Sequence, residues 1–279
     1  MGSQDVRRSP FAGTWYPADP SELASMVSRL IASAPRSEPP GKLVALISPH
    51  AGLRYSGPVA AAGYRLLERQ AFESVVILGP SHRAAFDALA TYPEGAFATP
   101  LGLAAIDSEL SRSFANATER ARPMPETHRG EHSLEMQVPF LQHLLPDSRI
   151  VPVMMGTQSS RNIEAAASAM VRVVSESAYP VLLIASSDLS HNESRDRARA
   201  LDSEVLDRIE RFDYEGLAEL LAQERGHACG GGPMVAVMMA ARELGAVESR
   251  ILAYGDSGDV SGETDAVVGY LSAALYGAA

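Results

Sequence analysis

The chain has 279 residues, of which 46% are hydrophobic and 21% are charged, a balance typical of a globular protein with a large core. Its formal net charge of -10 disfavours contact with a phosphate backbone, so we expect no nucleic acid partner. No apolar stretch is long enough to span a bilayer, and the amino terminus lacks the apolar core of a signal peptide. A single cysteine, Cys229, excludes an intramolecular disulfide and fits a reducing compartment. We therefore expect a soluble, cytoplasmic protein without a membrane partner, folded as one domain over residues 1–279.

The predicted elements alternate between strands and helices. A first helix is expected at about Ser21–Ile31, before a connector rich in proline and serine. Runs rich in Val, Ile and Leu without polar alternation, typical of buried strands in a mainly parallel sheet, occupy Leu43–Ile47, Val75–Leu78, Ile150–Met154, Val181–Ala185 and Ala266–Leu271. Apolar residues at three- and four-residue spacing predict helices over Pro58–Arg69, Asp107–Asn116, His132–Leu145, Arg161–Ser175, Asp196–Arg211, Tyr214–Gln223 and Pro233–Leu244. The alternation predicts an α/β fold with a mainly parallel central sheet and helices on both faces.

Prolines and one turn refine these boundaries. Pro58 and Pro233 suit the first turn of a helix, where the missing N–H costs nothing, whereas Pro139 lies inside its predicted helix and should kink or split it. The segment Ala88–Thr99, with Tyr92-Pro93-Glu94-Gly95 at its centre, predicts a turn between two short strands.

Histidines follow three of the predicted strands. His50 comes after the strand at Leu43–Ile47, His82 comes after the strand at Val75–Leu78, and His191 comes after a later one. Because ligands of open α/β sheets bind beyond the carboxyl ends of the strands, we expect these side chains to meet in one site. Neutral imidazole is a common ligand for Zn, Fe, Cu and Ni. The trio therefore predicts a metal site rather than three histidines that cap or hydrogen-bond locally.

Cys229 begins a glycine run that leads into the predicted helix at Pro233. The amino-terminal dipole of that helix favours a thiolate, so Cys229 is a candidate metal ligand. A small buried residue in a turn, or a glycine loop around an anionic substrate, explains the same pattern equally well. The glycine pattern of a dinucleotide site is absent after the first strand.

Polar and aromatic side chains in three places can support the histidines. Glu131 and His132 come at the start of a predicted helix, where they either cap that helix or orient a ligand and relay a proton. Asp188 lies three residues before His191 and either fixes its tautomer, binds metal or caps a turn. Near the amino terminus, Trp15-Tyr16 forms an aromatic pair, which we interpret as a core plug rather than a pocket wall.

These motifs, in this order, resemble those of the MEMO proteins (mediators of ErbB2-driven cell motility), whose microbial branch is called AmmeMemoRadiSam system protein B. The resemblance spans nearly the whole chain and rests on Ala12-Gly13-Thr14-Trp15-Tyr16, Pro49-His50-Ala51-Gly52, Gly79-Pro80-Ser81-His82, Thr99-Pro100-Leu101-Gly102, Glu131-His132-Ser133-Leu134-Glu135, Ser186-Ser187-Asp188 with His191, and Cys229-Gly230. It implies a fold similar to the catalytic subunit of the class III extradiol dioxygenases, which holds non-haem Fe(II). It also implies association with AMMECR1-like and radical SAM proteins.

The resemblance implies roles for individual residues as well. His50 and His82 match the two metal-binding histidines that the family retains, and Cys229 matches the cysteine that stands in place of the carboxylate ligand. His191 matches the acid/base histidine of the related dioxygenases. The catalytic candidates are therefore His191, Asp188, His132 and Glu131.

Three functions fit such a site. The first is a redox enzyme that uses Fe(II), or copper, on two histidines and a thiolate and acts on an unidentified small molecule. The second is a zinc-dependent hydrolase, because N and S ligands with an open water position are typical of catalytic zinc. The third is a non-catalytic protein that binds peptides or phosphopeptides in the inherited pocket, as animal members do. The acidic chain disfavours this third function, as does Gly230-Gly231-Gly232-Pro233, which replaces the Arg-His pair common in animal members.

Overall fold

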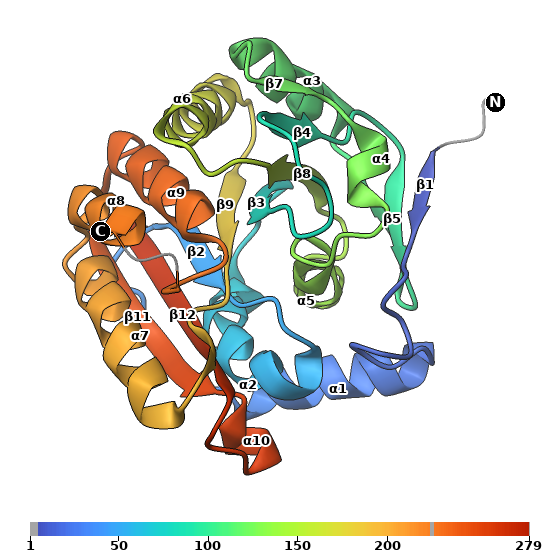
Figure 1. Ribbon diagram of the computed structural model, residues 1–279. Helices are drawn as coiled ribbons and strands as arrows, with labels where there is room; N and C mark the ends of the chain where they lie inside the picture. The colour runs from blue at the N-terminus through green and yellow to red at the C-terminus, as the bar shows by residue number, and fades with distance from the viewer. Residues whose placement is uncertain (1–4, 224–225, 279) are drawn as a thin grey trace.

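Figure 1 shows the computed structural model of the protein, which describes residues 5–223 and 226–278. Within these residues, nine strands form one sheet with the order β10-β12-β2-β9-β3-β8-β4-β7, and β11 also pairs with β12. The nine strands are β2 (Leu43–Ser48), β3 (Ser74–Pro80), β4 (Leu89–Thr91), β7 (Ala121–Pro123), β8 (Arg149–Met155), β9 (Val181–Ser186), β10 (His191–Glu193), β11 (Ala246–Asp256) and β12 (Val267–Gly277).

The middle of this sheet is parallel and its margins are largely antiparallel. β2, β9, β3 and β8 run in one direction, whereas β12 runs antiparallel to β2, and β4 runs antiparallel to β8. The predicted α/β fold is confirmed, and the sheet is mixed, with its parallel part at the centre. The strand predicted at Ala266–Leu271 is antiparallel because only a short connection joins β11 to β12, and parallel neighbours need a longer crossover.

A smaller sheet lies beside the large one. Among the described residues it contains β1 (Val6–Arg8), β5 (Ala96–Thr99) and β6 (Gly102–Ala105), in the order β1-β5-β6. The turn predicted at Tyr92-Pro93-Glu94-Gly95 does separate two strands, and it takes the chain from β4 in the large sheet to β5 in the small one.

Helices cover both faces of the large sheet (Figure 1). On one face lie α1 (Pro20–Ser33), α2 (Leu53–Tyr64) and α5 (Val138–Leu144). On the other face lie α3 (Ser108–Ala117), α6 (Ser160–Glu176), α7 (Arg195–Glu210), α8 (Tyr214–Gln223) and α9 (Gly231–Glu243). Short helical turns complete the described chain: η1 (Arg65–Arg69), α4 (Pro125–His128), η2 (Glu135–Gln137) and α10 (Gly258–Ser261).

Two predicted helix starts were wrong. α2 begins at Leu53, so Pro58 lies inside the helix rather than in its first turn. Pro58 has no N–H to donate to the carbonyl of Arg54. The loss is tolerated because both residues are exposed, so water can reach that carbonyl. The helix predicted from His132 begins only at Val138, with Pro139 in its first turn, so the expected split occurs. His132 consequently lies in a loop, free of helical geometry.

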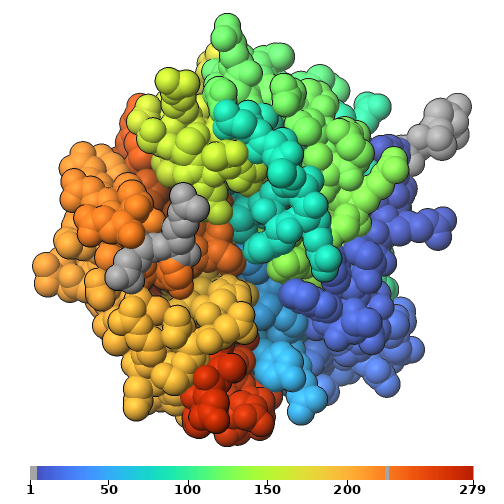
Figure 2. Space-filling view, in the orientation of Figure 1, coloured from blue at the N-terminus to red at the C-terminus, as the bar shows by residue number. Residues whose placement is uncertain are grey.

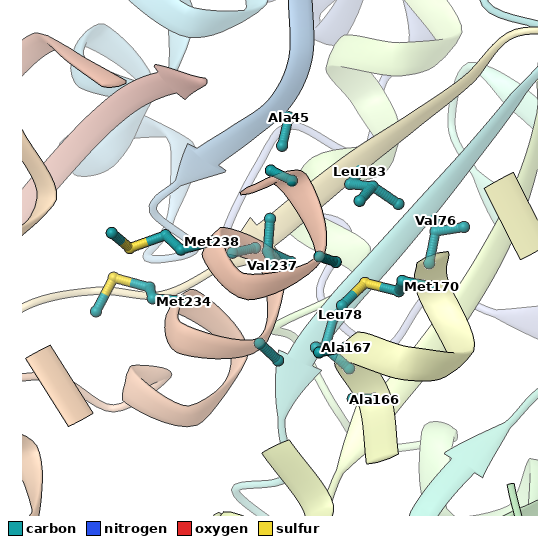
Figure 3. Packing of buried hydrophobic residues seen from close by; sticks show 14 of the residues in the cluster. Ala45, Val76, Leu78, Ala166, Ala167, Met170, Leu183, Met234, Val237 and Met238 are labelled. Carbon is teal, nitrogen blue, oxygen red and sulfur yellow. The ribbon is translucent and has the colours of Figure 1, made fainter. Parts of the chain in front are cut away.

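The continuous apolar character of the central strands follows from burial on both faces. Along β3, Val75 and Ile77 face one helical layer and Val76 and Leu78 face the other, and none of the four is exposed. Figure 3 shows Val76 and Leu78 close to Met170 of α6. No helix in the described ranges has the length and apolar character that crossing a membrane requires.

The central strand β9 supplies a direct test of this core. Leu183 is fully buried there, so Leu183→Ala should lower the free energy of unfolding by about 2–5 kcal/mol through lost burial and a cavity. Leu103→Ala makes the same change where the side chain is 60% exposed and should cost about 0.5 kcal/mol or less. Urea unfolding of the two variants measures both values, and equal losses would contradict the assignment of the core.

Candidate metal site

His50 lies just beyond the carboxyl end of β2 and is buried. Its backbone N–H donates to Oδ1 of Asp188 at 2.7 Å, and the N–H of Ala51 donates to the same oxygen at 3.2 Å. Asp188 follows β9, the parallel neighbour of β2, so one carboxylate joins the ends of two adjacent strands. Burial raises the pKa of Asp188 to about 6, although the two hydrogen bonds favour its charged form.

A buried amide fixes the surroundings of the His50 ring. Oε1 of Gln137 accepts a hydrogen bond from the Tyr64 hydroxyl at 2.7 Å. The amide nitrogen of Gln137 donates to the carbonyl of Pro49 at 3.0 Å and to Oγ of Ser186 at 2.8 Å. The carbonyl can only accept, so the amide cannot be turned around, and Ser186 must accept from it.

Ser186 in turn decides which nitrogen of His50 carries the proton. Its hydroxyl donates its single proton to the carbonyl of Ser133 at 2.5 Å. Nδ1 of His50 lies 2.9 Å from the same Oγ and must therefore be the donor of that hydrogen bond. Nε2 of His50 keeps its lone pair, which is the form of imidazole that binds a metal ion.

His82 follows β3, and its ring is oriented by Glu131. Oε1 of Glu131 accepts from Nδ1 of His82 at 2.9 Å, and Oε2 accepts from the backbone N–H of His82 at 2.6 Å. Oε1 also accepts from the backbone N–H groups of His132 and Ser133. Burial alone would raise the pKa of Glu131, but these hydrogen bonds outweigh it and lower the pKa to about 2. Because an ionised carboxylate only accepts, Nδ1 of His82 carries a proton, and in the neutral ring Nε2 has the lone pair.

His132 brings a third imidazole to the same place. Its ring stacks on that of His82 with centroids 4.5 Å apart, and it lies 5.2 Å from the ring of His50. Among the described residues, one ligand atom from each of these histidines lies within 4.8 Å of the other two, a group that could hold a metal ion. Burial lowers the pKa of His50 well below its usual range and lowers that of His132 to about 4, against the attraction of Glu131. Both rings are therefore neutral at neutral pH, as metal ligands must be.

Cys229 lies beside His50, with Sγ 3.1 Å from Nε2. Burial and the nearby Asp188 raise the pKa of the thiol, so the metal-free protein carries an S–H group that donates to Nε2. The approach requires glycine at position 230, because a Cβ on Gly230 would lie 2.4 Å from the carbonyl oxygen of Ser186. Cys229 thus contacts one of the three histidines, and the three-histidine group does not include it.

His191 lies at the border of the group. It is exposed at the start of β10, and its Nδ1 donates to the carbonyl of Leu189 at 2.8 Å, which leaves Nε2 free to take a proton. Its charge contributes to the lowered pKa of His50, so it is within electrostatic reach of that ring. Of the three histidines predicted to meet, the structure groups His50 and His82 with His132, whereas His191 lies outside this group.

The two aromatic residues near the amino terminus, Trp15 and Tyr16, have different surroundings. Tyr16 is 3% exposed and belongs to the core, as the interpretation of a core plug requires. Trp15 is partly exposed, and its ring lies 4.4 Å from that of His132 and 5.3 Å from that of Phe11. Trp15 therefore forms part of the wall around the three histidines.

A buried ion pair supports the loop that carries Glu131 and His132. Nη1 of Arg7 lies 2.5 Å from Oε2 of Glu135, and both side chains are almost fully buried. Nε of Arg7 donates to the carbonyl of His128 and Nη2 donates to the carbonyl of Glu131, each at 2.6 Å. β1 thereby holds both ends of the loop in place. Sequence reasoning missed this pair, since nothing in the local pattern separates Arg7 from its exposed neighbour Arg8.

Comparisons with known proteins place the chain in a family. The sequence model of a family described as Memo-like protein matches residues 7–274. A MEMO1 family protein of Methanopyrus kandleri is 39% identical over 275 residues, which cover 95% of this chain and 97% of the relative. A MEMO1 family protein of Sulfolobus acidocaldarius is 34% identical over 279 residues, covering 96% and 98%. In fold, the chain is similar to an uncharacterized protein from Escherichia coli K12, with a TM-score of 0.52, 14% identity, and coverage of 84% of this chain and 100% of that one.

The buried ion pair gives a prediction about the loop. Arg7→Met keeps much of the side-chain length but leaves the Glu135 carboxylate buried without its cationic partner, and should cost about 3–5 kcal/mol of stability. Arg8→Met is the matched control, because Arg8 is exposed, and should change stability by about 0.5 kcal/mol or less. Denaturant unfolding compares the two. An Arg7→Met protein as stable as the unmodified chain would show that the pair does not support the loop.

Proposed function

Since the chain belongs to the family of Memo-like proteins, we propose that it is a metal-binding redox enzyme that uses non-haem iron, or copper, on a small-molecule substrate. The observation that carries the proposal is the group of three histidines in which His50 and His82 follow the central strands β2 and β3 and His132 joins them from a loop. Ligand sites of open α/β sheets lie at this edge. The proposal also follows the resemblance to the extradiol dioxygenases, from which it takes the class of reaction.

The donor set fits a transition metal rather than Mg²⁺ or Ca²⁺. Imidazole and thiol groups are the ligands that Fe, Cu and Zn prefer, whereas the hard cations prefer oxygen. Nδ1 of His50 donates to a hydroxyl and Nδ1 of His82 donates to a carboxylate, the arrangement that metal-binding histidines usually show. In the neutral form of each ring, Nε2 therefore has the lone pair that binds a metal ion.

We assign His50 and His82 as two ligands and Cys229 as the third, with His132 as the competing third ligand. Cys229 approaches His50 closely, and the family resemblance favours it. His132 is favoured by its place in the three-histidine group. When bound, iron or copper supplies one-electron chemistry and open positions for substrate.

The remaining residues orient the ligands and move protons. In this proposal Nε2 of His191 accepts or returns a proton at the exposed border of the site. Asp188 fixes the turn that carries His50, and Glu131 fixes the ring of His82. Trp15 limits the access of water to His132.

A zinc-dependent hydrolase is the second candidate, and one observation favours it. Three histidines within ligand distance are a donor set of catalytic zinc, which leaves a fourth position for water. His191 would then be the general base. Cytoplasmic location and association with AMMECR1-like and radical SAM proteins remain predictions that accompany either function.

Metal analysis after anaerobic purification tests the proposal. The unmodified protein should carry about one iron or copper ion per chain, since one group of ligands is present. His82→Ala should lose most of the metal, whereas His143→Ala, which changes an exposed histidine that contacts Ser28, should keep it. Tightly bound zinc would favour the hydrolase, and a His82→Ala protein with undiminished metal would contradict both functions.

The third ligand is tested by a pair of variants. Cys229→Ser removes the soft sulfur donor, and His132→Gln removes an imidazole of similar size. We expect Cys229→Ser to lower metal affinity at least about tenfold and His132→Gln to have the smaller effect. Competition with a coloured chelator measures both affinities, and the reverse order would assign His132 as the ligand.

A further inference from the structure

β11 forms a long edge of the large sheet. The strand has 11 residues, Ala246–Asp256, and it pairs antiparallel with β12 along one side. In the described part of the chain no strand pairs with its other side. Figure 1 shows β11 at the margin of the sheet, and helices α2 and α7 contact it. The backbone groups along the outer side of β11, unpaired within the described residues, are therefore what this strand offers to another molecule.

The charges on this strand have a particular order. Glu248 and Arg250 flank Ser249, and Nε of Arg250 lies 2.5 Å from Oε1 of Glu248. Side chains two residues apart on a strand share a face, and these two are 42% and 43% exposed. One face of the strand therefore presents an acid and a base at equal distances on either side of residue 249.

This order is complementary to itself. If two copies of β11 lie antiparallel with Ser249 opposite Ser249, then Glu248 of each copy faces Arg250 of the other. Side chains directly opposite each other in an antiparallel pair have Cβ atoms about 5 Å apart, within reach of an ion pair. Two ion pairs related by a twofold axis result, which is the symmetry of most homodimers.

We propose that β11 is a dimerisation edge, through which two copies of this chain pair antiparallel about Ser249 and join their sheets. The same register sets Val247, an apolar residue that is 62% exposed, opposite Ile251 of the second copy and covers it. Irregularities in the pairing with β12 occur around Val247 and Leu252, so the regular part of the edge is short. Because a short edge forms few hydrogen bonds between the copies, we expect a weak dimer whose population depends on protein concentration.

Charge reversal tests the register. Arg250→Glu places glutamate opposite glutamate in both pairs, and Glu248→Arg places arginine opposite arginine. Each single variant should raise the dimer dissociation constant at least about tenfold at low salt, because repulsion replaces attraction at two positions. The double variant, with Glu248→Arg and Arg250→Glu, restores both pairs with the signs exchanged and should dimerise like the unmodified chain. Sedimentation equilibrium of the full chain measures all four proteins, and circular dichroism verifies that each is folded.

Mixing the two single variants is a second test. Formation of a heterodimer would itself show that both variants are folded. One variant then carries only acids at positions 248 and 250 and the other only bases, so a heterodimer should form where neither variant dimerises alone. A monomer at every concentration for the unmodified chain would overturn the proposal. A dimer that all the charge variants leave unchanged would also overturn it, because the contact would then lie elsewhere.

Discussion

The single proton of the Ser186 hydroxyl is the constraint on which the site depends. It is given to the carbonyl of Ser133, so Ser186 can only accept from its two other neighbours, the amide of Gln137 and the ring of His50. One buried hydroxyl thereby sets the tautomer of a histidine that lies on the next strand. A carboxylate achieves the same for His82, because Glu131 is ionised and has no proton to give.

Burial gives these hydrogen bonds their effect. An imidazolium inside a protein is costly, so His50 and His132 remain neutral, and the lone pairs that would otherwise take up protons stay available. Burial also makes each carboxylate expensive unless it is paired. Glu131 is satisfied by four N–H donors, and Glu135 is satisfied by Arg7 on one oxygen and by the hydroxyls of Ser9 and Tyr16 on the other. The residues that support the site are therefore buried in the core like the ligand His50.

The sequence predicted the central parallel strands and the residues at their ends, because burial on both faces leaves continuous apolar runs that are easy to recognise. It placed His50 and His82 at one edge for the same reason. It placed His132 among the supporting and catalytic residues rather than among the ligands, since the segment was expected to be helical, whereas the helix begins only at Val138. The sequence did not predict hydrogen bonds between distant residues. In the sequence Gln137 is one polar residue of a predicted amphipathic helix, and only the fold brings it to Pro49. β11 was missed because an edge strand with charged residues lacks the apolar signature of its buried neighbours.

The central claim is that the metal-free protein already presents bare Nε2 atoms on His50 and His82. Nitrogen-15 NMR of the imidazole rings measures this directly, since protonated and unprotonated ring nitrogens differ strongly in chemical shift. At neutral pH both rings should carry their proton on Nδ1, and addition of zinc should shift the Nε2 signals while Nδ1 stays protonated. A neutral ring with its proton on Nε2 and none on Nδ1, in either histidine of the metal-free protein, would contradict the account, because the hydrogen bond to Ser186 or Glu131 would then run in the opposite direction.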